Sequence, residues 1–210
     1  MNSNLYPVHT LLWVDALAAF EPTATPEWYS KHDSERPVVV RRAQHPEFIP
    51  VGIRGSNRSE RAAAWVTPAS VVRSLSPEQL VQSCPRYDQY SRHPLKQTAA
   101  LESISQIFAR LNIRWGVGGS VGFELATSII TANDNSDLDL IAYLPQMVSD
   151  SILAQLWQEL SDLPIQMDVQ IETEHGAFAL REWLQRNGQA VMMKTPYAPI
   201  LVKDPWQVSF

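Results

Sequence analysis

Two aspartates that alternate at the start of an apolar run constrain this chain more than any other feature. Residues 136–144 read Ser-Asp-Leu-Asp-Leu-Ile-Ala-Tyr-Leu. Side chains two apart on a strand point to the same face, so Asp137 and Asp139 are expected to project together while the leucines between them face a core. Two neighbouring carboxylates repel each other unless they are protonated or neutralised, and a divalent cation neutralises them well. The pattern predicts a cation site at the start of a strand; two solvent-facing aspartates are the alternative.

A third carboxylate lies on the next expected strand, residues 164–171. In Ile165-Gln166-Met167-Asp168-Val169-Gln170-Ile171 the apolar residues alternate with polar ones, so Asp168 shares the polar face. If this strand is a neighbour of the first, Asp168 completes a cluster of three carboxylates. An exposed polar face on an edge strand is the alternative for Asp168 alone.

A glycine-rich turn precedes the first aspartate strand. Residues 116–122 read Gly-Val-Gly-Gly-Ser-Val-Gly and lead into a helix. Glycines let a backbone approach a phosphate closely, and a helix N-terminus favours anions. Gly118, Gly119 and Ser120 are therefore candidate phosphate-binding residues, with Ser120 either capping the helix or donating to a phosphate oxygen. The turn lacks the lysine-serine ending of a P-loop and the longer spacing of a dinucleotide-binding motif.

The chain is expected to form two domains. Residues 1–90 form a smaller N-terminal α+β domain rich in short strands, and residues 91–210 form a larger α/β domain with a mixed sheet. The boundary is expected within the proline-containing connection at 84–94. The expected elements after it are a helix at 95–111, a strand at 113–117, the glycine turn and its helix, a strand at 138–144, a helix at 150–160, a strand at 164–171 and a helix at 176–186.

Charge and cysteine content exclude several classes of protein. The net charge of -5 argues against nucleic-acid binding, which depends on basic surfaces. Residues 1–100 carry 11 Lys and Arg against 9 Asp and Glu, and residues 101–210 carry 6 against 13. This distribution suits anionic ligand groups in one half and cations in the other; two solvated surfaces of different sign are the alternative. The single cysteine, Cys84, fits a reducing compartment, and no apolar run reaches membrane-spanning length. We expect a soluble, cytoplasmic protein.

A glycine-glycine-serine turn, a helix, an Asp-x-Asp strand and a later strand aspartate together resemble the nucleotidyltransferase superfamily. The resemblance implies a nucleotidyltransferase-like fold and attack of a hydroxyl on an α-phosphate, with pyrophosphate leaving. It also implies Mg²⁺ held by Asp137, Asp139 and Asp168, and leaving phosphates held by the turn 118–120. Such sites use two metal ions about 3.5–4 Å apart.

A further resemblance is carried by seven segments: 38–42, 49–55, 58–61, 115–126, 136–140, 194–195 and 204–206. These segments, which extend over nearly the whole chain, resemble the phosphoribosyl-dephospho-CoA transferases of malonate decarboxylase. The resemblance implies transfer of a prosthetic group from 2'-(5''-triphosphoribosyl)-3'-dephospho-CoA to a serine of an apo acyl carrier protein. The chain has Ser128 and Ile129 where this family pattern leads us to expect a glycine.

Five basic residues are candidates for binding the substrates that this resemblance implies. Arginine side chains match phosphate geometry, so they are candidates for binding the donor's phosphates or for docking an acidic carrier protein. Surface solubility is the alternative for each arginine, and the end of a strand is the alternative role for the lysine. The candidates are Arg41, Arg54, Arg58, Arg61 and Lys194.

Two other functions share these features. An adenylyltransferase that uses ATP would have the same metal cluster and differ only in its donor. A non-catalytic module that binds a carrier protein would not need the three carboxylates.

Overall fold

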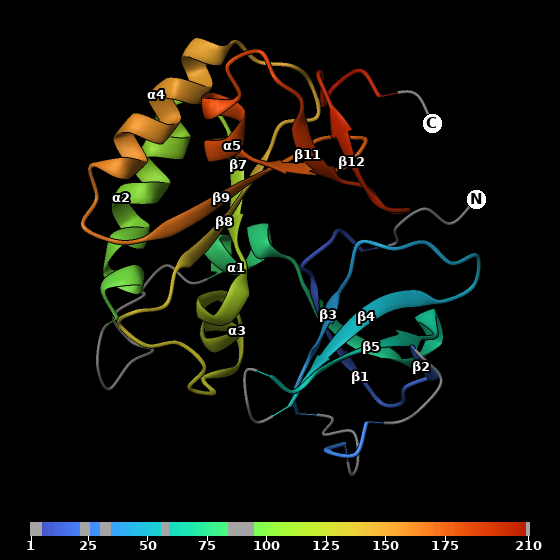
Figure 1. Ribbon diagram of the computed structural model, residues 1–210. Helices are drawn as coiled ribbons and strands as arrows, with labels where there is room; N and C mark the ends of the chain where they lie inside the picture. Colours follow the sequence, from blue (N-terminus) through green and yellow to red (C-terminus); the bar gives the residue numbers. More distant parts are fainter. Residues whose placement is uncertain (1–5, 22–25, 30–34, 56–58, 84–94, 209–210) are drawn as a thin grey trace. The chain divides into compact units, whose positions relative to one another are not determined.

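The computed structural model describes residues 6–21, 26–29, 35–55, 59–83 and 95–208 (Figure 1). The chain divides into two compact units, Met1–Ser76 and Pro77–Phe210. Each unit contains a six-stranded sheet, so the expected mixed α/β class is confirmed. The division falls earlier than the expected boundary at 84–94, a segment that lies outside the described residues.

The first unit is built from short antiparallel strands in the order β2-β5-β4-β3-β1-β6. Alternating valines and isoleucines turn one face of this sheet inward, and Val51, Leu12 and Ala64 are completely buried there. The strands are β1 (Leu11–Val14), β2 (Ala19–Glu21), β3 (Val38–Val40), β4 (Ile49–Arg54), β5 (Arg61–Val66) and β6 (Val71–Leu75), with a 3-10 turn at Pro68–Ser70 before β6.

The first α-helix that the structure describes belongs to the second unit. Helix α1 (Pro77–Ser83) packs against β7 (Arg114–Val117). A side chain at Gly116 would come within 2.4 Å of the α1 backbone, so only glycine lets the helix lie this close. Glu78 also accepts hydrogen bonds of 2.8 and 2.5 Å from the Arg114 guanidinium. The described part of the first unit therefore contains strands and a 3-10 turn and no α-helix.

The second unit contains a sheet in the order β12-β11-β10-β9-β8-β7, in which β8 and β9 are parallel and all other pairs are antiparallel. The mixed sheet predicted from the sequence is confirmed. Its remaining elements are α2 (Lys96–Arg110), α3 (Gly119–Thr127), β8 (Leu138–Tyr143), α4 (Asp150–Ser161), β9 (Met167–Glu172), β10 (Ala177–Ala179), α5 (Leu180–Gln185), β11 (Val191–Lys194) and β12 (Pro199–Val202).

The helix predicted over 176–186 is wrong in its first half. Residues 177–179 form β10, which pairs antiparallel with β9 and with β11, and only then does α5 begin. Phe178 is 1% exposed and packs against Trp183 and Trp206 with ring centroids 5.4 and 5.3 Å away. Burial of this aromatic ring against its neighbours overrides the helical propensity of the flanking alanines.

The two faces of the second sheet differ in character. Helices α2 and α4 lie together along one side of it (Figure 1). On the face that they cover, Leu138 and Leu140 are fully buried, and Phe108 of α2 stacks on Trp115 at 5.0 Å. Because side chains alternate along a strand, the residues between these leucines belong to the opposite face. That opposite face carries the predicted carboxylates.

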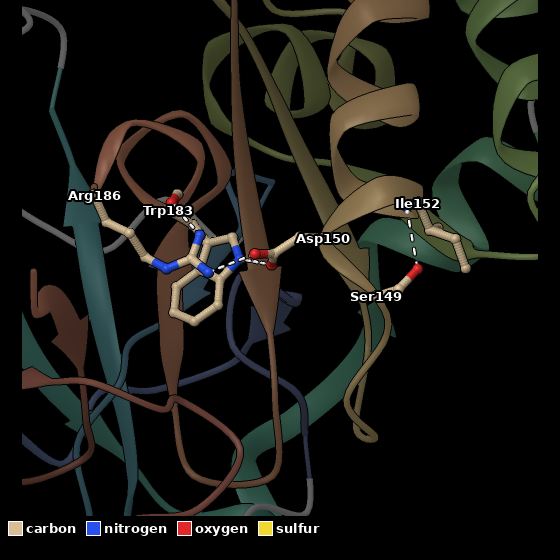
Figure 2. Close-up of polar contacts among 5 residues, drawn as sticks. All are labelled: Ser149, Asp150, Ile152, Trp183 and Arg186. Carbon is tan, nitrogen blue, oxygen red and sulfur yellow. Dashed lines mark hydrogen bonds and ion pairs between the residues drawn. The ribbon is translucent and has the colours of Figure 1, made fainter. Parts of the chain in front are cut away.

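A polar cluster fixes the N-terminus of α4 to α5 (Figure 2). The Ser149 hydroxyl accepts a hydrogen bond from the Ile152 amide at 3.4 Å and caps the helix. Asp150 accepts a 2.8 Å bond from the Trp183 indole and a 2.5 Å bond from the Arg186 guanidinium, which also lies 3.6 Å from the Trp183 ring centre. The Arg186 hydrogen bond lowers the pKa of the Asp150 carboxyl below its usual value.

Replacing Asp150 with asparagine should therefore change stability in a pH-dependent way. Since the pKa of Asp150 is lower in the folded state, its stabilisation is present above the unfolded value of 3.8 and is lost as the pH falls through the folded value. Half of the Asp150 side chain is exposed, so solvent screens the pair and the effect is modest. Thermal unfolding of Asp150→Asn should show a lower Tm than wild type at pH 7 and an equal Tm near pH 2. An equal difference at both pH values would contradict this role.

Candidate active site

The parallel pairing of β8 and β9 brings two of the predicted carboxylates together. Asp139 and Asp168 are direct partners in the ladder, so they extend from the same face at neighbouring positions. Strand β9 is internal, because β10 pairs with its other side, and the edge-strand alternative for Asp168 is excluded. Asp168 is exposed and Asp139 is half-buried. The condition set from the sequence, that the two strands be neighbours, is confirmed.

Asp137 lies one residue before β8 and is exposed. The ladder is continued at this end by a 3.0 Å hydrogen bond from the Leu138 amide to the Gln166 carbonyl. In the part of the chain that the structure describes, no three His, Cys, Asp or Glu side chains converge closely enough to hold a metal ion. The backbone thus brings the carboxylates to one end of the paired strands, while their side chains are not gathered around a common point.

The glycine turn and Asp139 fit against each other closely. The Gly118 amide donates to the Asp139 carbonyl at 2.9 Å, which joins the turn to β8. Gly119 has φ +61, and a Cβ there would lie 1.7 Å from Oδ2 of Asp139. The Asp139 carboxylate therefore occupies the space that a side chain at position 119 would need. It lies at the N-terminus of α3, where the helix dipole favours negative charge.

Ser120 does not cap α3, contrary to one of its two predicted roles. The helix begins at Gly119 with Gly118 as its N-cap, and the first intrahelical bond runs from the Gly122 amide to the Gly118 carbonyl at 2.8 Å. Ser120 lies inside the first turn and is 7% exposed, and its carbonyl accepts a 2.8 Å bond from the Thr131 hydroxyl. Its role toward a phosphate stays a prediction.

Lys194 lies on the same face of the sheet as the carboxylates. It ends β11 and is linked through Ala177 in the ladder to Glu172, which shares a face with Asp168. Its ammonium donates to the Gln170 side chain at 3.2 Å, and the Gln170 amide donates to Glu172 at 2.7 Å. The Lys194 ammonium therefore adds one positive charge to the face of the sheet that carries the carboxylates.

Two residues that the sequence reading missed hold the loop before Asp137. The Glu124 carboxylate of α3 accepts hydrogen bonds of 2.9 Å from the amides of Thr131 and Ala132. Gln97 of α2 donates from its side-chain amide to the Ser136 carbonyl at 2.5 Å. The signal for Gln97 was available, because it occupies an apolar-stripe position of its helix four residues before the buried Leu101.

Arg54 and Arg61 lie at one end of the sheet of the first unit, and Arg41 lies toward the other end, where its amide donates to the Pro50 carbonyl at 2.8 Å. Arg54 and Arg61 are direct partners across β4 and β5, an arrangement in which like charges repel unless an anion or a carboxylate is near. Arg41 donates to the Val51 carbonyl at 3.1 Å and lies 5.3 Å from the Trp65 ring centre, so part of its guanidinium holds the fold together. Arg58 lies outside the described residues. Phosphate or carrier binding by these arginines stays a prediction.

Comparison with known families covers almost the whole chain. Residues 79–205 match the phosphoribosyl-dephospho-CoA transferase MdcG C-terminal domain, and residues 7–77 match the N-terminal domain of the same family. The two matches agree closely with the two structural units. The chain belongs to the phosphoribosyl-dephospho-CoA transferase family, and it is a transferase.

Curated relatives match this chain over nearly their full lengths. A phosphoribosyl-dephospho-CoA transferase of Klebsiella pneumoniae (strain 342) is 38% identical over 207 residues, which are 98% of this chain and 98% of the relative. The transferase of Pseudomonas syringae pv. tomato is 40% identical over 205 residues, covering 96% and 93% of the two chains. That of Azotobacter vinelandii is 36% identical over 204 residues, covering 95% and 93%. No solved structure matches this chain. Among the described residues, no helix has both the length and the apolar character needed to cross a membrane.

Proposed function

We propose that this enzyme is a magnesium-dependent nucleotidyltransferase that moves a phosphoribosyl-dephospho-CoA group onto a serine of an apo acyl carrier protein, the carrier subunit of malonate decarboxylase. The donor is 2'-(5''-triphosphoribosyl)-3'-dephospho-CoA, and pyrophosphate is released. The observation that carries the proposal is the register that makes Asp139 and Asp168 direct neighbours beside the glycine turn. The family assignment supports the identity of the transferred group.

The residues at this end of the sheet fit Mg²⁺ in their chemistry. Mg²⁺ prefers carboxylate oxygens, and Asp137, Asp139 and Asp168 supply only such ligands. Adjacent strands lie about 4.8 Å apart, so rotation of the side chains is enough to bring Asp139 and Asp168 onto one ion. When bound, Mg²⁺ neutralises phosphate charge and lowers the pKa of the attacking hydroxyl.

The remaining groups orient the donor. Backbone amides in the first turn of α3 lack intrahelical acceptors and face anions, so the turn 118–120 binds the departing phosphates. Lys194 supplies a positive charge on the same face. Arg41, Arg54, Arg58 and Arg61 are proposed to bind further donor phosphates or the acidic carrier protein.

The transfer needs no nucleophile from this chain. The carrier serine oxygen forms a bond to the α-phosphorus, and the bond from that phosphorus to the oxygen bridging to the β-phosphorus breaks. The electron pair of the broken bond leaves with pyrophosphate, and the serine proton passes to a nearby carboxylate or to water. Asp168 is the candidate to orient the attacking hydroxyl, and Asp137 and Asp139 would hold the Mg²⁺ that neutralises the charge of the triphosphate.

Intact mass spectrometry of the carrier protein tests this proposal. Apo carrier protein is incubated with the enzyme, Mg²⁺ and the triphosphoribosyl donor, with parallel tubes that contain ATP or EDTA. The expected result is a gain equal to the phosphoribosyl-dephospho-CoA group that EDTA prevents. A gain of AMP only would move the donor to ATP. A carrier protein that stays unmodified while it binds the enzyme would favour a non-catalytic module.

Replacing Lys194 with methionine should weaken donor binding. Loss of one charge-assisted hydrogen bond to a phosphate is expected to raise the donor KM roughly ten-fold, with little change in kcat. The matched control is Lys203→Met, which removes a positive charge from an exposed residue just beyond β12. Steady-state kinetics with varied donor measure both constants. Equal KM values for the two variants would remove Lys194 from the site.

A further inference from the structure

Gln97 is a buried polar residue on an otherwise apolar stripe of α2. It is 2% exposed, and Leu101, Ile104 and Phe108, which follow it at helical spacing, are completely buried. Long polar side chains rarely lie this deep unless their hydrogen-bonding groups are used. The side chain of Gln97 is therefore held inside the unit by the contacts that its amide makes.

The amide nitrogen of Gln97 reaches the loop that delivers Asp137. It lies 2.5 Å from the Ser136 carbonyl oxygen, 3.3 Å from that of Asn133 and 3.4 Å from that of Asp134. An amide group has two hydrogens to share among these three acceptors, and the Ser136 carbonyl receives the closest contact. Three backbone carbonyls of the loop 133–136 thus converge on the Gln97 amide.

The Ser136 carbonyl belongs to the peptide unit that contains the Asp137 nitrogen. A peptide unit is planar, so holding its oxygen fixes the direction in which the Asp137 Cα leaves the loop. The Ser136 hydroxyl also accepts a 3.0 Å bond from the Asn133 amide, and Ser136 is 4% exposed, so this residue is held by its side chain as well as by its carbonyl. The exposed Asp137 carboxylate is consequently carried on a buried and hydrogen-bonded backbone.

Stability alone does not account for Gln97. Its Oε1 is buried and has no hydrogen-bond partner among the described residues. A half-satisfied buried amide is unfavourable compared with an apolar side chain of the same length, which would complete the apolar stripe of α2. The hydrogen bonds from the amide nitrogen to the loop before Asp137 explain why an amide is present at this position.

We propose that Gln97 is a positioning residue for the transfer reaction, which sets the Asp137 carboxylate by holding the Ser136 peptide. The proposal rests on the proposed function, because the placement of Asp137 matters only if the carboxylates take part in transfer. It adds a residue from α2, remote in sequence from both aspartate strands, to the machinery of the site.

The test compares Gln97→Met with Gln106→Met, the same exchange at an exposed position of the same helix. Mn²⁺, a substitute for Mg²⁺ detected by electron paramagnetic resonance, is titrated into each variant in the presence of the donor. Loss of a residue that orients a metal ligand typically costs about 10-fold to 100-fold in metal affinity or activity. We expect a loss of this size in both Mn²⁺ affinity and kcat for Gln97→Met. The donor KM at saturating metal should equal that of wild type, and the Tm should lie within about 4 °C of it. Gln106→Met should match wild type in every measurement.

Hydrogen exchange makes the test independent of turnover. Peptides that cover 131–137 should exchange faster in Gln97→Met, while peptides from β8 and β9 keep their protection. Wild-type kcat and Mn²⁺ affinity in Gln97→Met would overturn the proposal, as would unchanged exchange in 131–137. If the wild-type protein transfers the group but binds no Mn²⁺, the metal site of the proposed function is overturned. In that case a lower kcat together with faster loop exchange in Gln97→Met would still support the positioning role of Gln97.

Discussion

Asp139→Asn is expected to lower kcat for prosthetic-group transfer by about a thousand-fold, because a metal ion contributes several kcal/mol of charge stabilisation and each 1.36 kcal/mol is a factor of ten in rate. Asp139 is the carboxylate with contacts on both sides: Asp168 is its partner across the ladder, and Gly119 lies against its Oδ2. Asparagine keeps the shape of the side chain and removes the charge. The fold should persist, since the Gly118 amide bonds to the backbone carbonyl of this residue.

A matched variant separates this effect from a general loss of charge. Asp162→Asn makes the same exchange at the exposed C-cap of α4, and it should leave kcat unchanged. Circular dichroism and thermal unfolding check that both variants are folded. Full turnover by folded Asp139→Asn at saturating Mg²⁺ would contradict the assignment of this carboxylate to the metal.

Gly119→Ala is expected to lower activity at least a hundred-fold. The new Cβ would lie 1.7 Å from Oδ2 of Asp139, so the carboxylate or the start of α3 must move by more than an ångström. A misplacement of about 1 Å at a reacting centre can cost roughly 10²-fold in rate. The left-handed backbone at φ +61 adds a stability cost of about 1–2 kcal/mol.

Gly188→Ala separates the collision from the backbone strain. Gly188 has φ +77, and a Cβ there meets nothing within 4 Å. Both variants should therefore lose stability through backbone strain in urea unfolding, while only Gly119→Ala loses activity. If the two variants keep equal activity, the contact between Gly119 and Asp139 has no part in transfer.

The parts of the fold with strong periodicity were predictable from the sequence. The apolar spacing of 95–111 predicts α2 nearly to its ends, and the apolar run after Asp137 predicts β8. Strand β10 was not predictable, because a three-residue strand carries little pattern and its identity comes from pairing with β9 and β11. The division before α1 also depends on a tertiary contact, namely the approach of that helix to Gly116.

The candidate site was predictable where it depends on local pattern. Alternation along two strands identified Asp139 and Asp168, and their pairing followed once the strands proved to be neighbours. The turn was recognised from its glycines, but the contact between Gly119 and Asp139 follows from tertiary packing that a linear pattern does not contain. The glycine expected near Ser128 shows the same dependence on three-dimensional structure. Ser128 ends α3 with φ 60, a left-handed conformation that glycine usually adopts.

The central claim is that Asp137, Asp139 and Asp168 together hold the metal used for transfer. Anomalous scattering from crystals grown with Mn²⁺ and the triphosphoribosyl donor tests it most directly. We predict an anomalous peak at ligand distance, about 2 Å, from carboxylate oxygens of Asp137, Asp139 and Asp168, next to the donor's phosphates. A donor bound elsewhere, or a peak coordinated by other residues with these carboxylates turned away, would contradict the account.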